Sequence, residues 1–204
     1  TLTGADMPVI DGGGKGDVVT ITADHVTLRG FVIQGSAEDV ADEPAALRVK
    51  GNAATIEDNR MQQVLYGIVL EDSNGHVVRN NRVSSILRFE PERRGHGLYL
   101  WYTDGNTIED NIVEGVKDGI FLGFATHNQV IRNRVSDSRY GIHYMYANDN
   151  VFVDNVFTRG VVGAAIMFSR NITFRGNEFS YNRSPASGFG LLFKDVDNLE
   201  MTDN

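Results

Sequence analysis

The chain has 204 residues, 41% of them hydrophobic, and a formal net charge of −8 at pH 7. The acidic balance argues against a nucleic-acid groove, which needs an excess of basic side chains. There are no cysteines, so disulfide bonds and thiolate metal ligands are excluded, and no apolar run approaches the roughly 18 residues of a membrane span. We expect a single elongated domain over residues 1–204 that buries one continuous core.

The first 35 residues predict short strands separated by turns. Apolar segments lie at residues 8–12, 18–21 and 26–30, and Gly, Asp or Thr residues border them. These segments already resemble the middle of a β-domain. At the other end, the chain stops at Asn204, which resembles the asparagines of the repeat described in the next paragraph. Repetitive folds need polar caps at both ends, and neither end of this sequence resembles such a cap. We therefore expect the chain to be a fragment of a longer polypeptide, with no signal peptide of its own.

A repeat of 22 residues governs the rest of the chain. Asparagines mark it at Asn59, Asn81, Asn111, Asn133, Asn155 and Asn177. A glycine-led motif keeps the same step at Gly67, Gly97, Gly119, Gly141, Gly163 and Gly190. Both series lengthen by eight residues between the same two repeats, so one insertion at residues 87–94 explains both. Self-similarity with this period is typical of a solenoid.

Each repeat contains two short apolar stretches in which hydrophobic and other residues alternate, such as Ile120 and Leu122, then Val130 and Val135. Short alternating stretches between Gly, Asn and Asp predict strands and not helices. A coil of roughly 20–25 residues per turn, in which strands of successive turns stack ~4.8 Å apart, fits a repeat of this length. We therefore predict an all-β fold. The specific prediction is a right-handed parallel β-helix of about eight coils.

Stacking turns each position of the repeat into a row along the axis. Two rows are apolar throughout and are predicted to point inward: Met61, Val83, Val113, Val135, Phe157, Phe179, and Ile56, Val78, Ile108, Val130, Phe152, Phe174. The asparagine row predicts a corner ladder of amide hydrogen bonds, with asparagine accepting the left-handed backbone of a tight corner. One position earlier, Asp110, Arg132 and Asp154 alternate in charge. The aromatic row Tyr102, Phe124, Tyr146 and Phe168 is interpreted as packing.

Three insertions are predicted to be loops: residues 38–44, 87–94 and 184–188. The first explains why Gly30, at the corner position, stands 29 residues before Asn59. Where loops leave one flank of a solenoid, that flank is often the binding face.

A candidate metal site lies in the segment 141–145. Strand alternation points His143 and Met145 outward, and Met167 occupies the row of Met145 one repeat later. An imidazole with two thioethers suits Cu(I) and suits Ca²⁺ or Mg²⁺ poorly. The sequence therefore predicts copper binding at these three residues.

Two further histidines are candidate accessories. His96 lies in the row of Asp118, so a pair between them could orient a ligating imidazole or act as a general base. His127 precedes Asn128 in a predicted turn and is a candidate peripheral ligand. His25 and His76 have no such neighbours in the repeat and are interpreted as structural.

Outward positions near this site carry the aromatic residues Tyr99, Trp101 and Phe121. Large aromatics exposed beside a charged loop are typical of a partner-binding surface. The alternative is that a loop covers them.

Five stretches carry a resemblance to a known family: RRGHGLYLW at 93–101, KDGIFLGFATHN at 117–128, RYGIHYMYANDNVFVDN at 139–155, GAAIMFSRN at 163–171 and FGLLFKDVDN at 189–198. They resemble the NosD family of periplasmic copper-binding β-helix proteins, which assist maturation of nitrous oxide reductase. The resemblance implies export to the periplasm, cooperation with the ATPase and permease of an ABC transporter, and supply of copper to the apo-reductase. It also implies a full-length polypeptide roughly twice as long.

A second reading is a carbohydrate-active β-helix enzyme, such as a polysaccharide lyase, epimerase or hydrolase. Such enzymes need clustered acids with Arg or Lys along one outward face. The outward row before the asparagines mixes charges with aliphatic residues: Glu57, Arg79, Glu109, Ile131, Val153 and Arg175. A copper-binding protein needs soft ligands, whereas the enzyme needs a carboxylate and base cluster in a groove.

Overall fold

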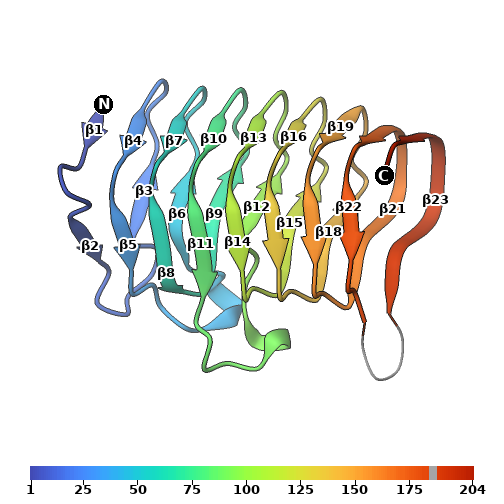
Figure 1. Cartoon of the computed structure of the whole chain (residues 1–204). Helices are drawn as coiled ribbons and strands as arrows, with labels where there is room; N and C mark the ends of the chain where they lie inside the picture. Colours follow the sequence, from blue (N-terminus) through green and yellow to red (C-terminus); the bar gives the residue numbers. More distant parts are fainter. Residues whose placement is uncertain (184–187) are drawn as a thin grey trace.

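The computed structural model describes residues 1–183 and 188–204 as a solenoid of parallel strands, with its first and last strands at opposite ends (Figure 1). Two short 3-10 helices, η1 (Val40–Asp42) and η2 (Pro91–Arg93), lie in the loops on one flank. In the described part of the chain no helix is long and apolar enough to cross a membrane.

Each coil contributes strands to three faces. Face 1 consists of β3 (Val19–Ile21), β6 (Ala45–Val49), β9 (Tyr66–Glu71), β12 (Leu98–Trp101), β15 (Asp118–Gly123), β18 (Tyr140–Met145) and the first half of β21 (Val162–Arg175). Face 2 consists of β1 (Leu2–Thr3), β4 (Thr27–Arg29), β7 (Thr55–Glu57), β10 (Val77–Arg79), β13 (Thr107–Glu109), β16 (Gln129–Ile131), β19 (Asn150–Val153) and the second half of β21.

Face 3 is an eight-stranded sheet of its own, formed by β2 (Val9–Asp11), β5 (Val32–Gln34), β8 (Arg60–Val64), β11 (Arg82–Ser85), β14 (Ile112–Glu114), β17 (Arg134–Ser136), β20 (Val156–Thr158) and β22 (Glu178–Ser180). Faces 1 and 2 form one 15-stranded sheet because β21 runs through both, and β23 (Phe189–Thr202) pairs with β21 along its length.

The strand register follows the repeat found in the sequence. Ile108 pairs with Val130, and Val130 pairs with Phe152, each 22 residues further on. The eight strands of face 3 agree with the expected number of coils. The predicted parallel β-helix is therefore confirmed.

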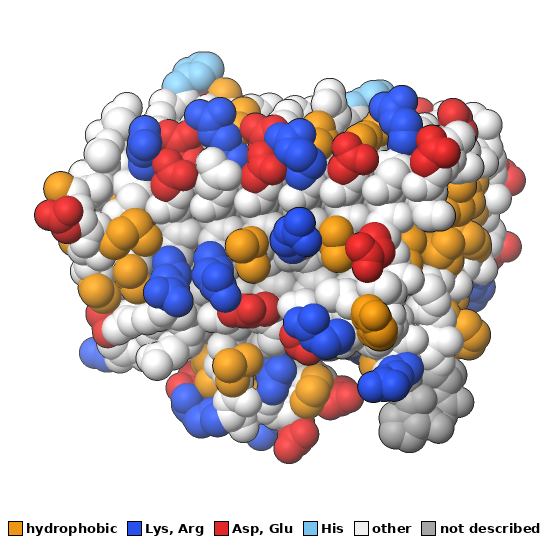
Figure 2. Space-filling model, in the orientation of Figure 1, with side chains coloured by type: hydrophobic (Ala, Val, Ile, Leu, Met, Phe, Trp, Pro, Cys, Tyr) orange, Lys and Arg blue, Asp and Glu red, His pale blue; other side chains and the backbone are white. Residues whose placement is uncertain are grey.

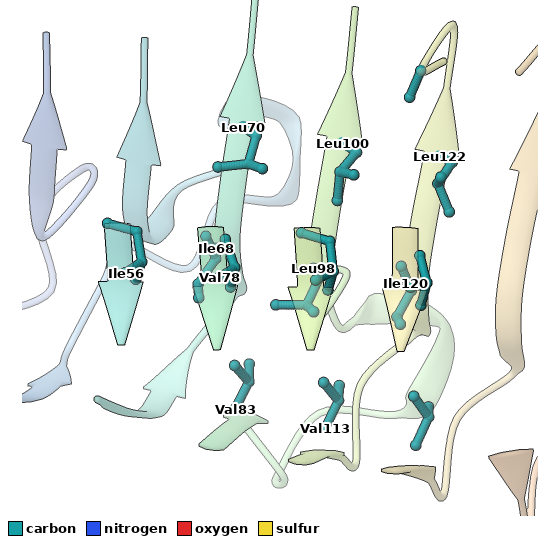
Figure 3. Close-up of a cluster of buried hydrophobic side chains, with 14 of the residues drawn as sticks. Ile56, Ile68, Leu70, Val78, Val83, Leu98, Leu100, Val113, Ile120 and Leu122 are labelled. Atoms are coloured by element: carbon teal, nitrogen blue, oxygen red, sulfur yellow. The ribbon is translucent and has the colours of Figure 1, made fainter. Parts of the chain in front are cut away.

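The core fills the inside of the solenoid with stacked rows of aliphatic and aromatic side chains. Figure 3 shows Leu70, Leu100 and Leu122 following one another along the axis, and each is at most 1% exposed. Fully burying one such side chain contributes about 1.5–3 kcal/mol. The hydrophobic cluster continues from Ile21 to Phe174, so both inward rows predicted from the sequence lie in it or pack against it.

The asparagine ladder forms the corner between face 2 and face 3. The Nδ2 group of Asn111 donates to Oδ1 of Asn133 at 2.9 Å, and that of Asn133 donates to Asn155 at 3.0 Å. Each Oδ1 also accepts a backbone N–H, as from Asn111 to Asn133 at 3.0 Å. The left-handed backbone falls one residue earlier than expected, at Asp110 and Arg132, with φ of 55° and 52°.

A second asparagine ladder, which the sequence interpretation missed, stands at the corner between face 1 and face 2. Asn106 donates from Nδ2 to Asn128 at 2.7 Å, and Asn128 donates to Asn150 at 2.9 Å. His76 occupies the position of this ladder one coil earlier, where its backbone N–H donates to Asn106 Oδ1. The buried ring of His76 forms a hydrogen bond with the hydroxyl of Ser73. The spacing of 22 residues was visible in the sequence and would have revealed this ladder.

Two of the predicted loops cover part of the outer side of face 1. Ala45, Leu65, Tyr66, Val69 and Ile86 form a second buried hydrophobic cluster outside the solenoid, with Val40, Phe89 and Tyr99 packed against it. Arg88 of the second loop forms an ion pair with Glu38 of the first. The third insertion lies mostly outside the described residues.

Candidate functional site

The outer side of β15, β18 and β21 brings three of the predicted ligands onto one patch. In the register of these strands Met145 pairs with Met167, and His143 pairs with Ala165. Ile142 and Tyr144, which alternate with these two residues along β18, are fully buried in the core, so His143 and Met145 project outward. Neighbouring strands lie about 4.8 Å apart, and positions i and i+2 lie about 7 Å apart.

A buried carboxylate lies directly beside this patch. Arg139 binds Asp118 with two nitrogens, from Nε to Oδ1 at 2.8 Å and from Nη2 to Oδ2 at 2.6 Å. His143 Nδ1 lies 2.8 Å from the same Oδ2. Burial alone would raise the pKa of Asp118, but the hydrogen bonds from His143 and Arg139 outweigh burial and lower this pKa to about 2. Asp118 is therefore ionised at neutral pH.

His96 approaches the same carboxylate without bonding to it. Its Nδ1 lies 3.4 Å from Asp118 Oδ2, within ion-pair distance, yet the geometry leaves this nitrogen with no hydrogen-bond partner among the described residues. The ring packs against both Tyr99 and Phe121, with centroids 5.3 and 4.9 Å away, and those two rings also contact each other at 5.0 Å. Burial lowers the pKa of His96 to about 4 even though Asp118 opposes the shift. The predicted neighbours His96 and Asp118 are therefore adjacent, but the hydrogen bond to this carboxylate comes from His143.

His127 lies apart from these residues. It is exposed in the turn between β15 and β16, and its Nδ1 pairs with Asp104 Oδ1 at 2.7 Å. That hydrogen bond raises the pKa of His127. Its backbone N–H donates to Asn148, in the next turn along the axis. No contact in the described structure joins His127 to His143.

The predicted partner surface requires a correction. Phe121 is only 9% exposed, because His96, Tyr99 and His143 pack against its ring, so it is too buried to be a docking residue. Tyr99 and Trp101 are half-buried and stack on each other with centroids 5.9 Å apart. Tyr99 also packs against the cluster beneath the loops, as the alternative interpretation expected.

The exposed aromatic rings belong instead to the corner row beside Trp101. Tyr102 is 51% exposed and Tyr146 is 46% exposed, with Phe124 stacked between them at 4.7 and 5.3 Å. Trp101 packs edge-on against Phe124 at 5.4 Å. The sequence held a signal for this exposure, because the same row begins at Asp72 and ends at Asp195, and aspartates occupy solvent-facing positions.

The outward side chains of this patch carry soft donor atoms: the thioether sulfurs of Met145 and Met167 and the imidazole of His143. In the described part of the chain no group of three His, Asp or Glu side chains is placed to hold a metal ion. Methionine is not among those side chains, which leaves the two thioethers beside His143 as candidate donors. Sulfur and imidazole ligands fit Cu(I), and they fit hard divalent cations poorly.

Comparison with known proteins also points to copper. A family model described as "Periplasmic copper-binding protein (NosD)" matches residues 84–204. The "Probable ABC transporter binding protein NosD" of Pseudomonas aeruginosa is 28% identical over 112 residues, which are 54% of this chain and 26% of that protein. The protein of the same name from Stutzerimonas stutzeri is 29% identical over 113 residues, with the same coverage. These matches span about a quarter of the relatives' own length.

Among solved structures, a variant of the periplasmic alginate epimerase AlgG is similar with a TM-score of 0.57 at 15% sequence identity, covering 84% of this chain and 55% of that one. At this identity the likeness concerns the fold alone. The periplasmic location expected from the sequence agrees with the description of the matching family. The family model covers more than half of the residues, and the chain belongs to the NosD family of periplasmic copper-binding proteins.

Proposed function

We propose that this chain is the copper-binding part of a periplasmic accessory protein that helps deliver Cu(I) to apo-nitrous oxide reductase together with an ABC transporter. The observation that carries the proposal is the pairing of Met145 with Met167 on adjacent strands, with His143 on the same outer side two residues before Met145. Membership of a copper-binding family supports the choice of metal.

The donor set suits a metal that must be held and then released. Thioether sulfur and neutral imidazole are soft or intermediate ligands, and they carry no charge that would attract Ca²⁺ or Mg²⁺. Asp118 is not a ligand in this proposal, because it is fully buried and both its oxygens are engaged by Arg139. An outward site on a rigid strand pair also costs little to preorganise.

The proposed partners are the reductase and the ATPase and permease of the transporter. Both curated relatives are named as ABC transporter binding proteins, which supports the transporter part. Metal transfer requires that ligands and docking surface coincide, and Trp101 with the exposed corner rings lies beside Met145. Aromatic residues near the centre of an interface typically carry much of its binding free energy.

The proposal is tested by titrating Cu(I) in competition with a chromophoric chelator. We compare wild type with the double variant Met145→Leu/Met167→Leu, which keeps side-chain volume and removes both sulfurs. Met7→Leu is the matched control, because Met7 is an exposed methionine far along the chain from the site. We expect the double variant to keep its thermal stability and to bind Cu(I) at least tenfold more weakly, and equal affinity would refute the assignment.

A carbohydrate-active enzyme remains the second candidate, because Asp118, Arg139 and His143 form an acid–arginine–imidazole cluster on the outer side of a β-helix. The burial of Asp118 weighs against it, since only His143 of the pair has any exposure. The acids on face 2 and its corner are interspersed with arginines, as Figure 2 shows, and ion pairs such as Asp110–Arg132 join them. Incubation with polyuronates tests this reading, with unsaturated or epimerised products as the positive result.

A further inference from the structure

We infer that Asp118, clamped by Arg139, is a positioning residue that holds the hydrogen of His143 on Nδ1 and so presents a bare Nε2 for Cu(I). The inference rests on the proposed copper site and adds the residue that prepares its imidazole in the metal-free protein.

The tautomer follows from the donor and acceptor roles of the two side chains. Both oxygens of Asp118 accept from the Arg139 guanidinium, as in a charged bidentate pair, and an ionised carboxylate can only accept hydrogen bonds. The His143 Nδ1 atom, 2.8 Å from Asp118 Oδ2, must therefore carry the hydrogen. In a neutral imidazole only one nitrogen is protonated, so Nε2 keeps its lone pair. In the described part of the chain Nε2 forms no hydrogen bond, which leaves it available.

The carboxylate is held rigidly enough to impose this choice. Arg139 binds both oxygens of Asp118, and a bidentate pair fixes orientation as well as charge. The Arg139 guanidinium in turn lies over the ring of Tyr140, 4.4 Å from its centroid. Asp118 itself has no exposed surface. Water therefore has little access to replace His143 as its partner.

The ring of His143 is also restrained by its neighbours. Phe121 and Tyr140 pack against it in T-shaped contacts, with centroids 4.8 and 5.1 Å away. Since Nδ1 points at Asp118, Nε2 lies on the opposite side of the ring. His96 competes for the same oxygen but stays 3.4 Å away without a hydrogen bond, so Asp118 selects His143 of the two imidazoles. A carboxylate behind a metal-binding histidine is a common arrangement, and its loss typically weakens metal affinity about 10–100-fold.

The test begins with the metal-free protein. Two-bond ¹H–¹⁵N spectra of histidine-labelled protein in mildly alkaline buffer distinguish a protonated from a bare ring nitrogen, and the signals missing from His143→Gln identify this residue. We expect wild type to show hydrogen on Nδ1 and a bare Nε2. Hydrogen on Nε2 with a bare Nδ1 would overturn the inference, whatever the protein does with copper.

The variant Asp118→Asn then tests the consequence. We expect His143 to lose its single tautomer and Cu(I) affinity to fall about 10–100-fold. Asp137→Asn is the control, because Asp137 forms an exposed ion pair with Arg159 of the adjacent coil, and it should change neither signal nor affinity. Loss of the tautomer with unchanged Cu(I) affinity would overturn the positioning role.

Two further variants separate the role of Asp118 from the effect of an unpaired Arg139 charge and from the copper proposal itself. Asp118→Asn leaves the Arg139 cation without its partner, so Asp118→Asn/Arg139→Gln, which removes both charges, repeats the titration after circular dichroism has shown native strand content. If neither variant folds, the wild-type tautomer alone decides. Unchanged Cu(I) affinity in His143→Gln would refute the proposed copper site, while the tautomer spectrum would still judge the role of Asp118.

Discussion

Replacing Asn133 with leucine tests the corner ladder that sets the register of the whole solenoid. Asn133 is fully buried, and its side chain makes five hydrogen bonds. Leucine is similar in volume but can neither donate nor accept. The change therefore removes every one of these bonds without creating a large cavity.

The cost can be worked from the groups that lose their partners. Asn111 has no exposed surface, and its backbone N–H and one Nδ2 hydrogen both end at Asn133 Oδ1. Asn155 Oδ1 keeps the backbone N–H of Asn133, 2.8 Å away, so it stays satisfied. Two orphaned buried donors cost about 1–3 kcal/mol each, which predicts a loss of about 2–6 kcal/mol in the free energy of unfolding. For a chain of this size that loss lowers the melting temperature by about 4 °C or more.

Thermal and urea unfolding followed by circular dichroism measure the effect. The control is Asn74→Leu, because Asn74 is exposed and its Oδ1 accepts the backbone N–H of Asp104 at 2.7 Å, the same kind of bond in contact with water. We expect the control to change stability by less than about 0.5 kcal/mol. Equal melting temperatures for Asn133→Leu and Asn74→Leu would refute the reasoning that burial makes this ladder costly to break.

Two further predictions concern pH and docking. The pKa of His96 is lowered from its ordinary value of 6.5 to about 4 in the folded protein, so the unfolded chain binds a proton first, and stability should fall by about 3 kcal/mol as pH drops from 6.5 to 4. Unfolding midpoints measured across this range should lose most of that slope in His96→Gln, and an unchanged slope would contradict the assignment. In pull-downs with full-length protein, Trp101→Ala/Tyr102→Ala should weaken binding to the reductase or the transporter by about 2 kcal/mol, roughly thirtyfold. Full retention of both partners would place the docking surface elsewhere.

Much of the fold could be predicted from the sequence because a solenoid repeats its constraints. The common step of 22 residues in the asparagine and glycine series determines which residues stack, and the pairings of Val130 with Ile108 and Phe152 follow directly. Period-two alternation then determines which side chains enter the core. It correctly placed His143 outside the core, next to buried Ile142 and Tyr144.

The remaining features of the site depend on how far side chains extend to neighbouring strands and on how loops pack, and the alignment of repeats does not contain this information. Asp118 stands in the row of Tyr140, but its carboxylate reaches diagonally to His143, three residues further along the next strand. Phe121 occupies an outward row and is still buried, because neighbouring rings close over it. An outward position therefore does not by itself mean an exposed one.

The central claim, that His143, Met145 and Met167 bind Cu(I), is tested most directly by X-ray absorption at the copper edge of protein loaded with one equivalent of Cu(I). The account predicts scattering from sulfur together with imidazole nitrogen, although the chain has no cysteine. It also predicts that the sulfur contribution disappears in Met145→Leu/Met167→Leu and persists in Met7→Leu. A first shell of nitrogen and oxygen alone in the wild-type protein would contradict the account.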